Sequence, residues 1–235
     1  MNTTIGEIIE RIQSAYSKGV RSASSRLSSR LIYSKYKSVR KMLVAQQIKK
    51  KQKISDWNYI ILPCVELIKV PSHECSCLGH LGCDVWRTKY PLPKVLTDLN
   101  KHMIDFVMTV DNGDRIEEFT REAAIYASGN KYTAKKNKWI LEKGHLFFTS
   151  QKTPGLVKIK LLPEDPIEAS KYPSFCEDCT DCIDCTPYMD RPSYLDGELE
   201  EPLIAIAVEE LVGRFSTARE DKSNNSSDSL IEESK

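Results

Sequence analysis

The sequence has 235 residues, of which 40% are hydrophobic and 29% are charged, and its formal net charge is +1. This length and composition allow one large domain or two modest ones with a buried core, as in an ordinary soluble protein. No stretch of about 18 consecutive apolar residues occurs, which argues against a membrane-spanning helix. The first residues lack the basic start and apolar run of a secretory signal, so we expect the chain to stay in the cytosol where it is made.

Residues 4–18 are predicted to form the first helix. Thr4 followed by Glu7 is a capping-box pattern, in which each side chain accepts a hydrogen bond from the other residue's backbone amide. Gly19 is expected to end the helix. The apolar positions at helical spacing form its buried stripe: Ile5, Ile8, Ile9, Ile12, Ala15 and Tyr16.

Residues 24–53 contain no proline or glycine and predict one long helix, about 40–45 Å at 1.5 Å per residue. About five residues separate it from the first helix, which predicts an αα-hairpin. Its apolar stripe is expected at Leu27, Leu31 or Ile32, Tyr36, Val39, Leu43 and Gln46.

The other face of this predicted helix is basic, and residues 11–55 hold thirteen Lys and Arg residues without one Asp or Glu. Such a face suits either an assembly contact or a nucleic-acid surface, because phosphate neutralisation needs only clustered cations. Lys53 adds to its densest part. The candidate residues for DNA or subunit contact are Arg26, Arg30, Lys37, Arg40, Lys41, Lys49, Lys50 and Lys51.

Residues 57–162 are predicted to form a mostly antiparallel β-rich insertion. Pro63 indicates an edge strand or a bulge, residues 111–114 predict a tight turn, and residues 117–127 predict a brief helix. The absence of helical crossovers between the short strands argues against a doubly wound nucleotide-binding sheet. Strands are expected at 57–70, 84–90, 102–110, 138–142, 145–150 and 156–162, with a hairpin turn at Lys143 and Gly144.

Residues 163–197 are expected to form an acidic, cysteine-rich loop, and residues 198–217 a helix with Pro202 in its first turn. This helix has a wide apolar face and should pair with the N-terminal hairpin. The last residues, 218–235, predict a flexible tail, in which Leu230 and Ile231 offer a contact for a partner. The wide face comprises Leu203, Ile204, Ala207, Val208, Leu211, Val212 and Phe215.

The predicted fold class is therefore α+β, with four parts. Residues 1–56 and 198–217 form a discontinuous helical body, 57–162 the β-rich insertion, 163–197 the loop and 218–235 the tail.

Residues 164–210 carry fourteen acidic side chains against only Lys171 and Arg191. Two explanations stay open, because these acids can pair with the basic helix of the same chain or of a neighbouring subunit.

The eight cysteines are expected to be thiols or metal ligands rather than a disulfide framework. One group is evenly spaced by two residues, as in iron–sulfur proteins, but four nearby acidic residues disfavour further thiolate charge. The alternative is a loop of reduced thiols, and neither a metal nor a cofactor is assigned. The two groups are Cys176, Cys179, Cys182 and Cys185, and His73, Cys75, Cys77 and Cys83.

Catalysis has little support in this sequence. There is no phosphate-binding glycine loop, nucleophile elbow or metalloprotease histidine pair. His145 lies in a predicted strand, where a packed histidine is the simpler interpretation. A non-enzymatic protein is predicted. The alternatives are a subunit of a larger assembly, a small nucleic-acid-binding protein using residues 24–53, and a metal-binding module built on the cysteine loops.

Eight segments along nearly the whole chain carry a family resemblance: TIGEIIERIQ (4–13), SRLSSRLIYSKYKSVRKML (25–43), KISDWNYIILPCVELI (53–68), PSHECSCLGHLGCDVWRTKYPLP (71–93), GNKYTAKK (129–136), LLPEDPIEA (161–169), EEPLIAIAVEELVGRF (200–215) and NNSSDSL (224–230). In these segments the chain resembles a virion structural protein of tailed phages of the crAss-like type, which infect Bacteroides-type gut bacteria.

The resemblance implies an adaptor-type ring protein of the head-to-tail connector, which docks beneath the portal and surrounds the DNA exit channel. It also implies a closed ring, usually of twelve copies, and a tail that docks on the portal. The implied partners are further copies of the chain, the portal, other neck and tail rings, and genomic DNA without sequence specificity; no membrane is implied. The implied location is the virion neck, after assembly in the host bacterial cytoplasm.

Overall fold

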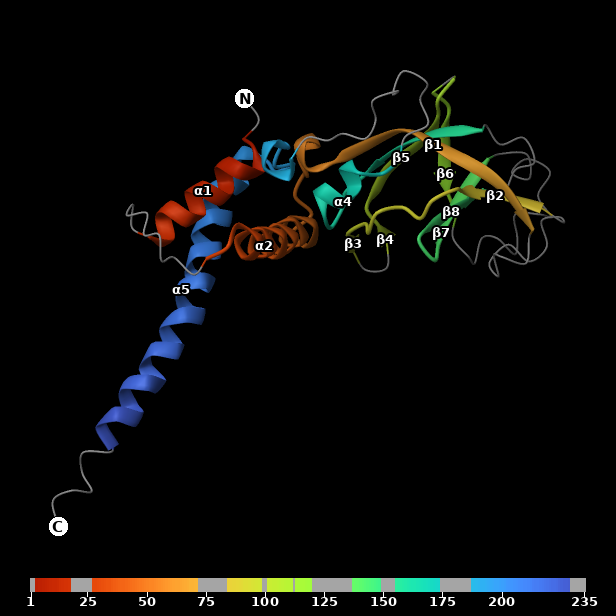
Figure 1. Ribbon diagram of the computed structural model, residues 1–235. Coiled ribbons are helices and arrows are strands. Elements are labelled where there is room, and N and C mark those ends of the chain that lie inside the picture. Colours follow the sequence, from red (N-terminus) through yellow and green to blue (C-terminus); the bar gives the residue numbers. More distant parts are fainter. Residues whose placement is uncertain are drawn as a thin grey trace, which may run out of the picture. The chain divides into compact units, whose positions relative to one another are not determined.

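The computed structural model describes residues 3–17, 27–71, 84–98, 101–111, 113–119, 137–148, 155–173 and 187–228, with side chains to residue 214 in the last range. The chain divides into two compact units. One is helical and comprises Met1–Lys53 with Pro187–Lys235; the other comprises Ile54–Thr186 and contains the strands (Figure 1). In the part of the chain that is described, no helix is long and apolar enough to cross a membrane.

Helix α1, Ile5–Tyr16, begins as the sequence predicts. The Glu7 amide donates to Thr4 Oγ1 at 3.2 Å, and the Thr4 amide donates to Glu7 Oε2 at 3.0 Å. Both halves of the capping box are therefore present, and two amides at the helix start are satisfied. The predicted stripe is buried at Ile5, Ile8, Ile9 and Ile12.

Helix α2, Ser29–Lys49, has 21 residues and is therefore about 30 Å long, shorter than predicted. It begins where the Ser28 side chain accepts a hydrogen bond from the Leu31 amide at 3.3 Å. It ends in a Schellman motif, in which the amides of Lys51 and Gln52 donate to carbonyls of the last turn. Lys51 adopts the left-handed conformation there, with φ 54°.

The buried stripe of α2 follows the prediction, with Ile32 rather than Leu31 inside. Gln46 is not buried, and Val44 and Ile48 are buried near the end of the helix. The helical period is therefore confirmed, although near the C-terminus of the helix the buried positions are Val44 and Ile48 instead of Gln46. The confirmed members are Leu27, Ile32, Tyr36, Val39 and Leu43.

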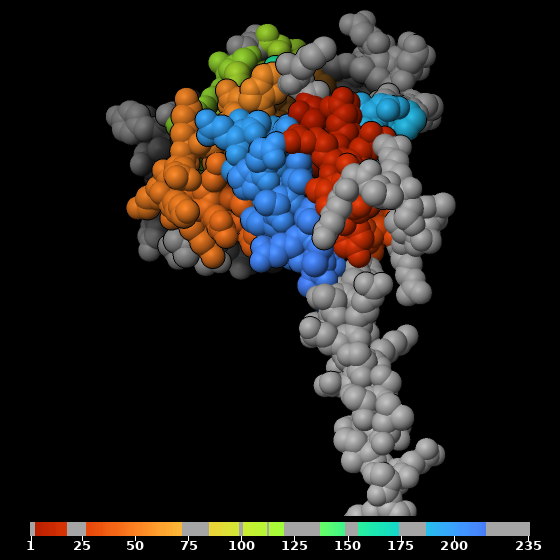
Figure 2. Space-filling model, turned by 90° about the vertical axis from the view of Figure 1, so that its left-hand side faces the viewer, coloured from red at the N-terminus to blue at the C-terminus, as the bar shows by residue number. Residues whose placement is uncertain are grey.

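Helix α5, Gly197–Asp228, is longer than predicted. It continues through eleven residues of the predicted flexible tail, because residues 214–228 contain no proline or glycine to end it. Because α5 begins at Gly197, Pro202 lies inside the helix rather than in its first turn. α5 packs against both α1 and α2 (Figure 2). Its apolar face is narrower than predicted, since Val212 is 46% exposed.

The second unit is a closed barrel in the order β1-β2-β8-β7-β6-β5-β9. Neighbouring strands run antiparallel, except that β6 and β7 are parallel. β3 (Thr97–Asp98) and β4 (Lys101–His102) form a separate pair. The barrel strands are β1 (Ile60–Pro71), β2 (Asp84–Thr88), β5 (Ile104–Thr109), β6 (Arg115–Glu118), β7 (Lys138–Glu142), β8 (His145–Phe148) and β9 (Leu156–Leu161).

Two local predictions about the strands are confirmed. The pairing of β1 with β9 shifts between Leu62 and Val65, which places a bulge at Pro63; β1 has a neighbour on both sides, so it is not an edge strand. Lys143 and Gly144 join β7 to β8 with φ 49° and 81°, the positive values that a type I′ hairpin turn requires.

The helix predicted at 117–127 is wrong at its start. Glu117 and Glu118 belong to β6 and pair with β7, and the next amide, that of Phe119, donates to Trp139 O at 2.7 Å. Strand pairing therefore overrode the local helical period. Residues 120–127 lie outside the described ranges.

The predicted 163–197 loop includes a short helix α4, Pro166–Ser170, and a 3-10 turn η4, Tyr188–Asp190. Asp165 caps α4 by accepting from the amides of Ile167 and Glu168. Cys64 contradicts the expectation of thiols or metal ligands, since it is buried in β1 and is disulfide-bonded.

Candidate assembly and nucleic-acid surfaces

Part of the basic charge of α1 and α2 is neutralised by acids of α5. Arg11 of α1 pairs with Glu200, at 3.5 Å, and with Glu201. Lys35 of α2 pairs with Glu210, Nζ to Oε2, at 2.7 Å. The acidic segment therefore meets the basic one within a single chain at these positions. Each pair is partly exposed and contributes little to stability by itself.

Arg40 is a correction to the predicted basic face, because its side chain is fully buried. It lies on the same side of α2 as Tyr36, one helical turn away. Its Nε donates to the carbonyl of Tyr194 at 3.1 Å, and the Tyr36 hydroxyl donates to the carbonyl of Ser193. Arg40 therefore anchors the segment that leads into α5 and cannot contact DNA or a neighbouring subunit in this fold.

The same segment, 191–195, is also bound to the start of α1. The Ile5 amide donates to Arg191 O at 2.9 Å, and the Ser193 amide donates to Thr3 O at 3.0 Å. The segment thus connects α1 with α2. Arg40 of α2 is buried because it holds this segment in place.

The other candidate residues of the basic face divide into three groups. Lys37 is half-buried and Lys41 exposed, and each already has an interaction of its own. Arg30 is exposed near the start of α2. Arg26 lies outside the described residues, as do Leu230 and Ile231 of the tail. The predicted continuous face along the helix is therefore interrupted.

What remains is a compact group at the C-terminal end of α2, which we call the lysine corner: Lys49, Lys50, Lys51 and Lys53. All four side chains are exposed, and none forms an ion pair with another described residue. The negative end of the α2 dipole stabilises one or two cations at this end of the helix. Four lysines within five positions repel one another, and an external polyanion would relieve that repulsion.

The barrel unit carries a second surface, which sequence reasoning missed and which we call the Trp57 knob. The 3-10 turn η1, Asp56–Asn58, precedes β1 and leaves Trp57 60% exposed. Lys160 of β9 holds the base of this turn, with Nζ 2.8 Å from Asp56 Oδ1 and 2.9 Å from Asp105 Oδ2. The same ammonium lies 4.9 Å from the ring centre of Tyr59.

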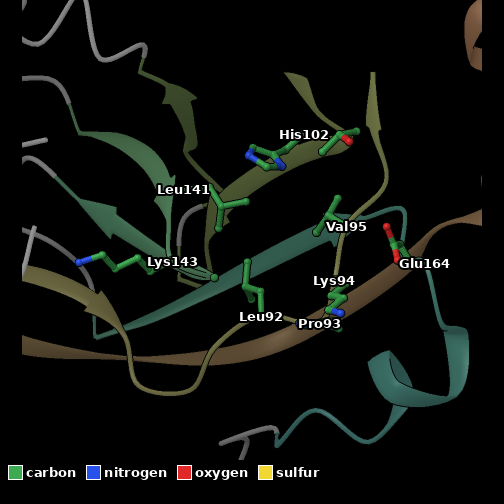
Figure 3. A pocket seen from close by; sticks show the side chains of 10 residues that line it. Leu92, Pro93, Lys94, Val95, His102, Leu141, Lys143 and Glu164 are labelled. Atoms are coloured by element: carbon green, nitrogen blue, oxygen red, sulfur yellow. The ribbon is translucent and has the colours of Figure 1, made fainter. Parts of the chain in front are cut away.

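A pocket of about 290 Å³ opens on the barrel unit where the connector before β3, strand β4 and the β7–β8 turn meet. Figure 3 shows Leu92, Val95, Leu141 and His102 around one space, with Lys94 on one side and Lys143 on the other, where its side chain extends away from the space. Its floor is apolar and its flanks are basic, apart from the half-buried Glu164. Such a lining suits the binding of an apolar group with a negative neighbour better than acid–base chemistry.

The metal and catalytic candidates add no site in the described part of the chain. Within it, no three His, Cys, Asp or Glu side chains gather as a metal-binding group. Every member of both predicted cysteine groups lies outside the described ranges. His145 is half-buried in β8, and its Nδ1 lies 2.8 Å from the carbonyl of Thr88.

The described surfaces of the two compact units offer exposed charges and exposed apolar side chains, which suit contacts with other macromolecules. The comparison with known families agrees: over residues 7–230 the chain matches phage tail ring protein 2, a family of crAss-like phages, and belongs to it. It is thus a structural ring protein of the virion, as the resemblance implies, and further copies of the chain are among its partners. No curated protein matches the chain.

Proposed function

We propose that the chain is an adaptor subunit of the head-to-tail connector, in a ring that docks beneath the portal and surrounds the DNA exit channel. The observation that carries the proposal is the lysine corner, together with membership of a tail ring family. A ring around a DNA channel needs cations that attract phosphates without reading bases. Exposed lysines without ion-pair partners among the described residues meet that need.

The cations that are already paired limit where DNA would be met. Arg11, Lys35 and Arg40 are engaged inside the helical unit, so the densest group of exposed cations on α2 is the lysine corner at its C-terminal end. Charges in physiological salt are screened over about 8 Å. In the proposed ring the corner therefore points toward the channel, close to the phosphates.

The proposal extends to the portal through the C-terminus. α5 continues past α1 and α2 as far as Asp228 (Figure 1), and Leu230 and Ile231 follow closely in the sequence. In this proposal these two apolar residues dock on the portal, the ring contains twelve copies, and assembly takes place in the host cytoplasm. The proposal assigns no catalytic step.

A reconstruction of the particle at the vertex that carries the tail tests the proposal. The expected result is a closed ring next to the portal, with the lysine corner within about 8–10 Å of DNA density. Absence of the protein from purified particles would contradict the proposal, and so would a ring in which the corner faces away from the channel.

Binding in solution provides a second test of the corner. The triple variant Lys49→Gln, Lys50→Gln and Lys51→Gln should weaken duplex DNA binding equally for different sequences. The slope of log affinity against log salt should fall by about 0.9 for each phosphate that the variant no longer neutralises. Lys35→Gln is the matched control, because that lysine is already paired with Glu210. Unchanged binding by the triple variant would contradict the DNA assignment.

The runner-up is a nucleic-acid-binding protein that acts as a free monomer, and the same lysine corner favours it. The two functions differ in copy number. A connector subunit occurs at a fixed number per particle, whereas a free DNA-binding protein is absent from washed particles but binds DNA tightly as a monomer.

A further inference from the structure

Hydrogen bonds and an ion pair fix the backbone turn that carries the exposed Trp57. The Asn58 amide donates to Ser55 O and the Tyr59 amide donates to Asp56 O, each at 3.1 Å, so the 3-10 turn is closed by its own backbone. The Lys160–Asp56 pair ties the turn to β9. A side chain on a backbone turn that is already formed costs no backbone entropy when a partner covers it, and tryptophan is among the residue types most enriched where binding energy concentrates.

The charge around the knob identifies the kind of partner. Asp56 and Asp105 share one ammonium, that of Lys160, and the Arg115 guanidinium donates to the Asp105 backbone carbonyl at 2.8 Å. The Asp56 side chain is still 88% exposed despite its ion pair. This exposed carboxylate lies next to Trp57 in the sequence and repels DNA phosphates. The knob therefore suits a protein surface with an apolar recess and basic side chains beside it.

The pocket of the barrel unit has both properties. Leu92, Val95 and Leu141 form an apolar recess, and the exposed lysines Lys94 and Lys143 also line it, together with the half-buried Glu164. Neither lysine pairs with a described acidic residue. Trp57 is not among the residues that line the recess, so the knob and the pocket are two separate patches of one unit.

We propose that Trp57 of one subunit inserts into the Leu92–Val95–Leu141 pocket of the next copy in the ring, with Asp56 beside Lys94 and Lys143 of that copy. Contact between two different patches of identical chains is heterologous, and such contacts close into a ring when the rotation between copies divides a full turn. The proposal rests on the ring function above and names the subunit contact within it.

Photo-cross-linking in assembled particles tests the contact directly. A photoreactive phenylalanine analogue in place of Trp57 of the full chain should give a dimer band after irradiation. Mass spectrometry should place the cross-link on peptides that contain Leu92, Val95 or Leu141. No dimer, or a cross-link to another protein or to another part of the chain, would overturn the contact while leaving the ring function standing. Absence of the chain from particles would overturn the ring function as well.

Variants provide a second measurement with a matched control. Trp57→Ala should lower incorporation into particles about tenfold or more, as expected for a central aromatic anchor. Val110→Ala is the control, because Val110 is also an exposed apolar residue of the barrel unit, and its effect should stay within about twofold. Circular dichroism should show the same folded barrel in both. Equal incorporation of the Trp57 variant and the control would overturn the proposal.

The charged flank has its own test. Lys94→Glu combined with Lys143→Glu should reduce incorporation by opposing Asp56 of the neighbour, whereas Lys94→Arg combined with Lys143→Arg should keep it near the wild-type level. A charge-reversed variant that assembles as well as the wild type would contradict the proposed position of Asp56.

Discussion

Replacing Arg40 by alanine tests whether this side chain belongs to the interior of the helical unit or to an exposed basic face. A buried Arg40 predicts a large loss of stability, whereas an exposed Arg40 predicts unchanged stability and weaker DNA binding. The side chain is fully buried and its Nε donates to Tyr194 O at 3.1 Å. A hydrogen bond from a charged donor contributes about 1.5–3 kcal/mol. Alanine also removes about two buried methylenes, at about 0.8 kcal/mol each. We expect Arg40→Ala to lower the free energy of unfolding by about 3–5 kcal/mol.

The assay is urea unfolding followed by far-ultraviolet circular dichroism, which reports the helical unit. Lys50→Ala is the control, since Lys50 is exposed at the end of the same helix; it should change stability by less than about 0.5 kcal/mol. Arg40→Lys should fall between them, because lysine keeps the charge and the aliphatic stem but not the planar Nε donor. If Arg40→Ala left stability within about 1 kcal/mol of wild type and instead weakened DNA binding, the assignment of Arg40 to the interior would be wrong.

Two further predictions follow from strained or charged positions. Lys51→Gly should stabilise the helical unit by about 1 kcal/mol, because φ is 54° there and glycine adopts this conformation without steric penalty; destabilisation in a thermal melt would refute this. Hydrogen bonds to Asp56 and Asp105 raise the pKa of Lys160 above its ordinary value of 10.5. Its contribution to stability is therefore complete below pH 10.5 and is lost as the pH rises through the higher folded-state pKa. Lys160→Met should remove this alkaline dependence, which unfolding at a series of pH values measures; an unchanged profile would show that other groups cause it.

The basic and acidic segments of this chain meet each other only in part. The acidic helix α5 meets Arg11 and Lys35 of its own chain, so intrachain pairing accounts for part of the separation. It does not account for the lysine corner. Pairing within the chain therefore explains the basic residues Arg11 and Lys35, whereas contact with another molecule stays the explanation for the lysine corner.

Local features were determined by the sequence alone. The Thr4–Glu7 capping box, the bulge at Pro63 and the turn at Lys143 and Gly144 each depend on a few adjacent residues, whose side chains or dihedral angles restrict the backbone directly. The resemblance to a phage ring protein was also visible in the sequence, because it extends over nearly the whole chain.

Only the tertiary structure decided which charges are available and which apolar groups are exposed. Arg40 and Lys50 belong to the same basic segment, yet one is buried against the residues before α5 and the other faces solvent. Likewise, the Trp57 knob exists because β9 and β5 bring Lys160 and Asp105 beside η1. These interactions join residues far apart in the sequence, and their free energies depend on packing and desolvation at the site, which no local pattern encodes.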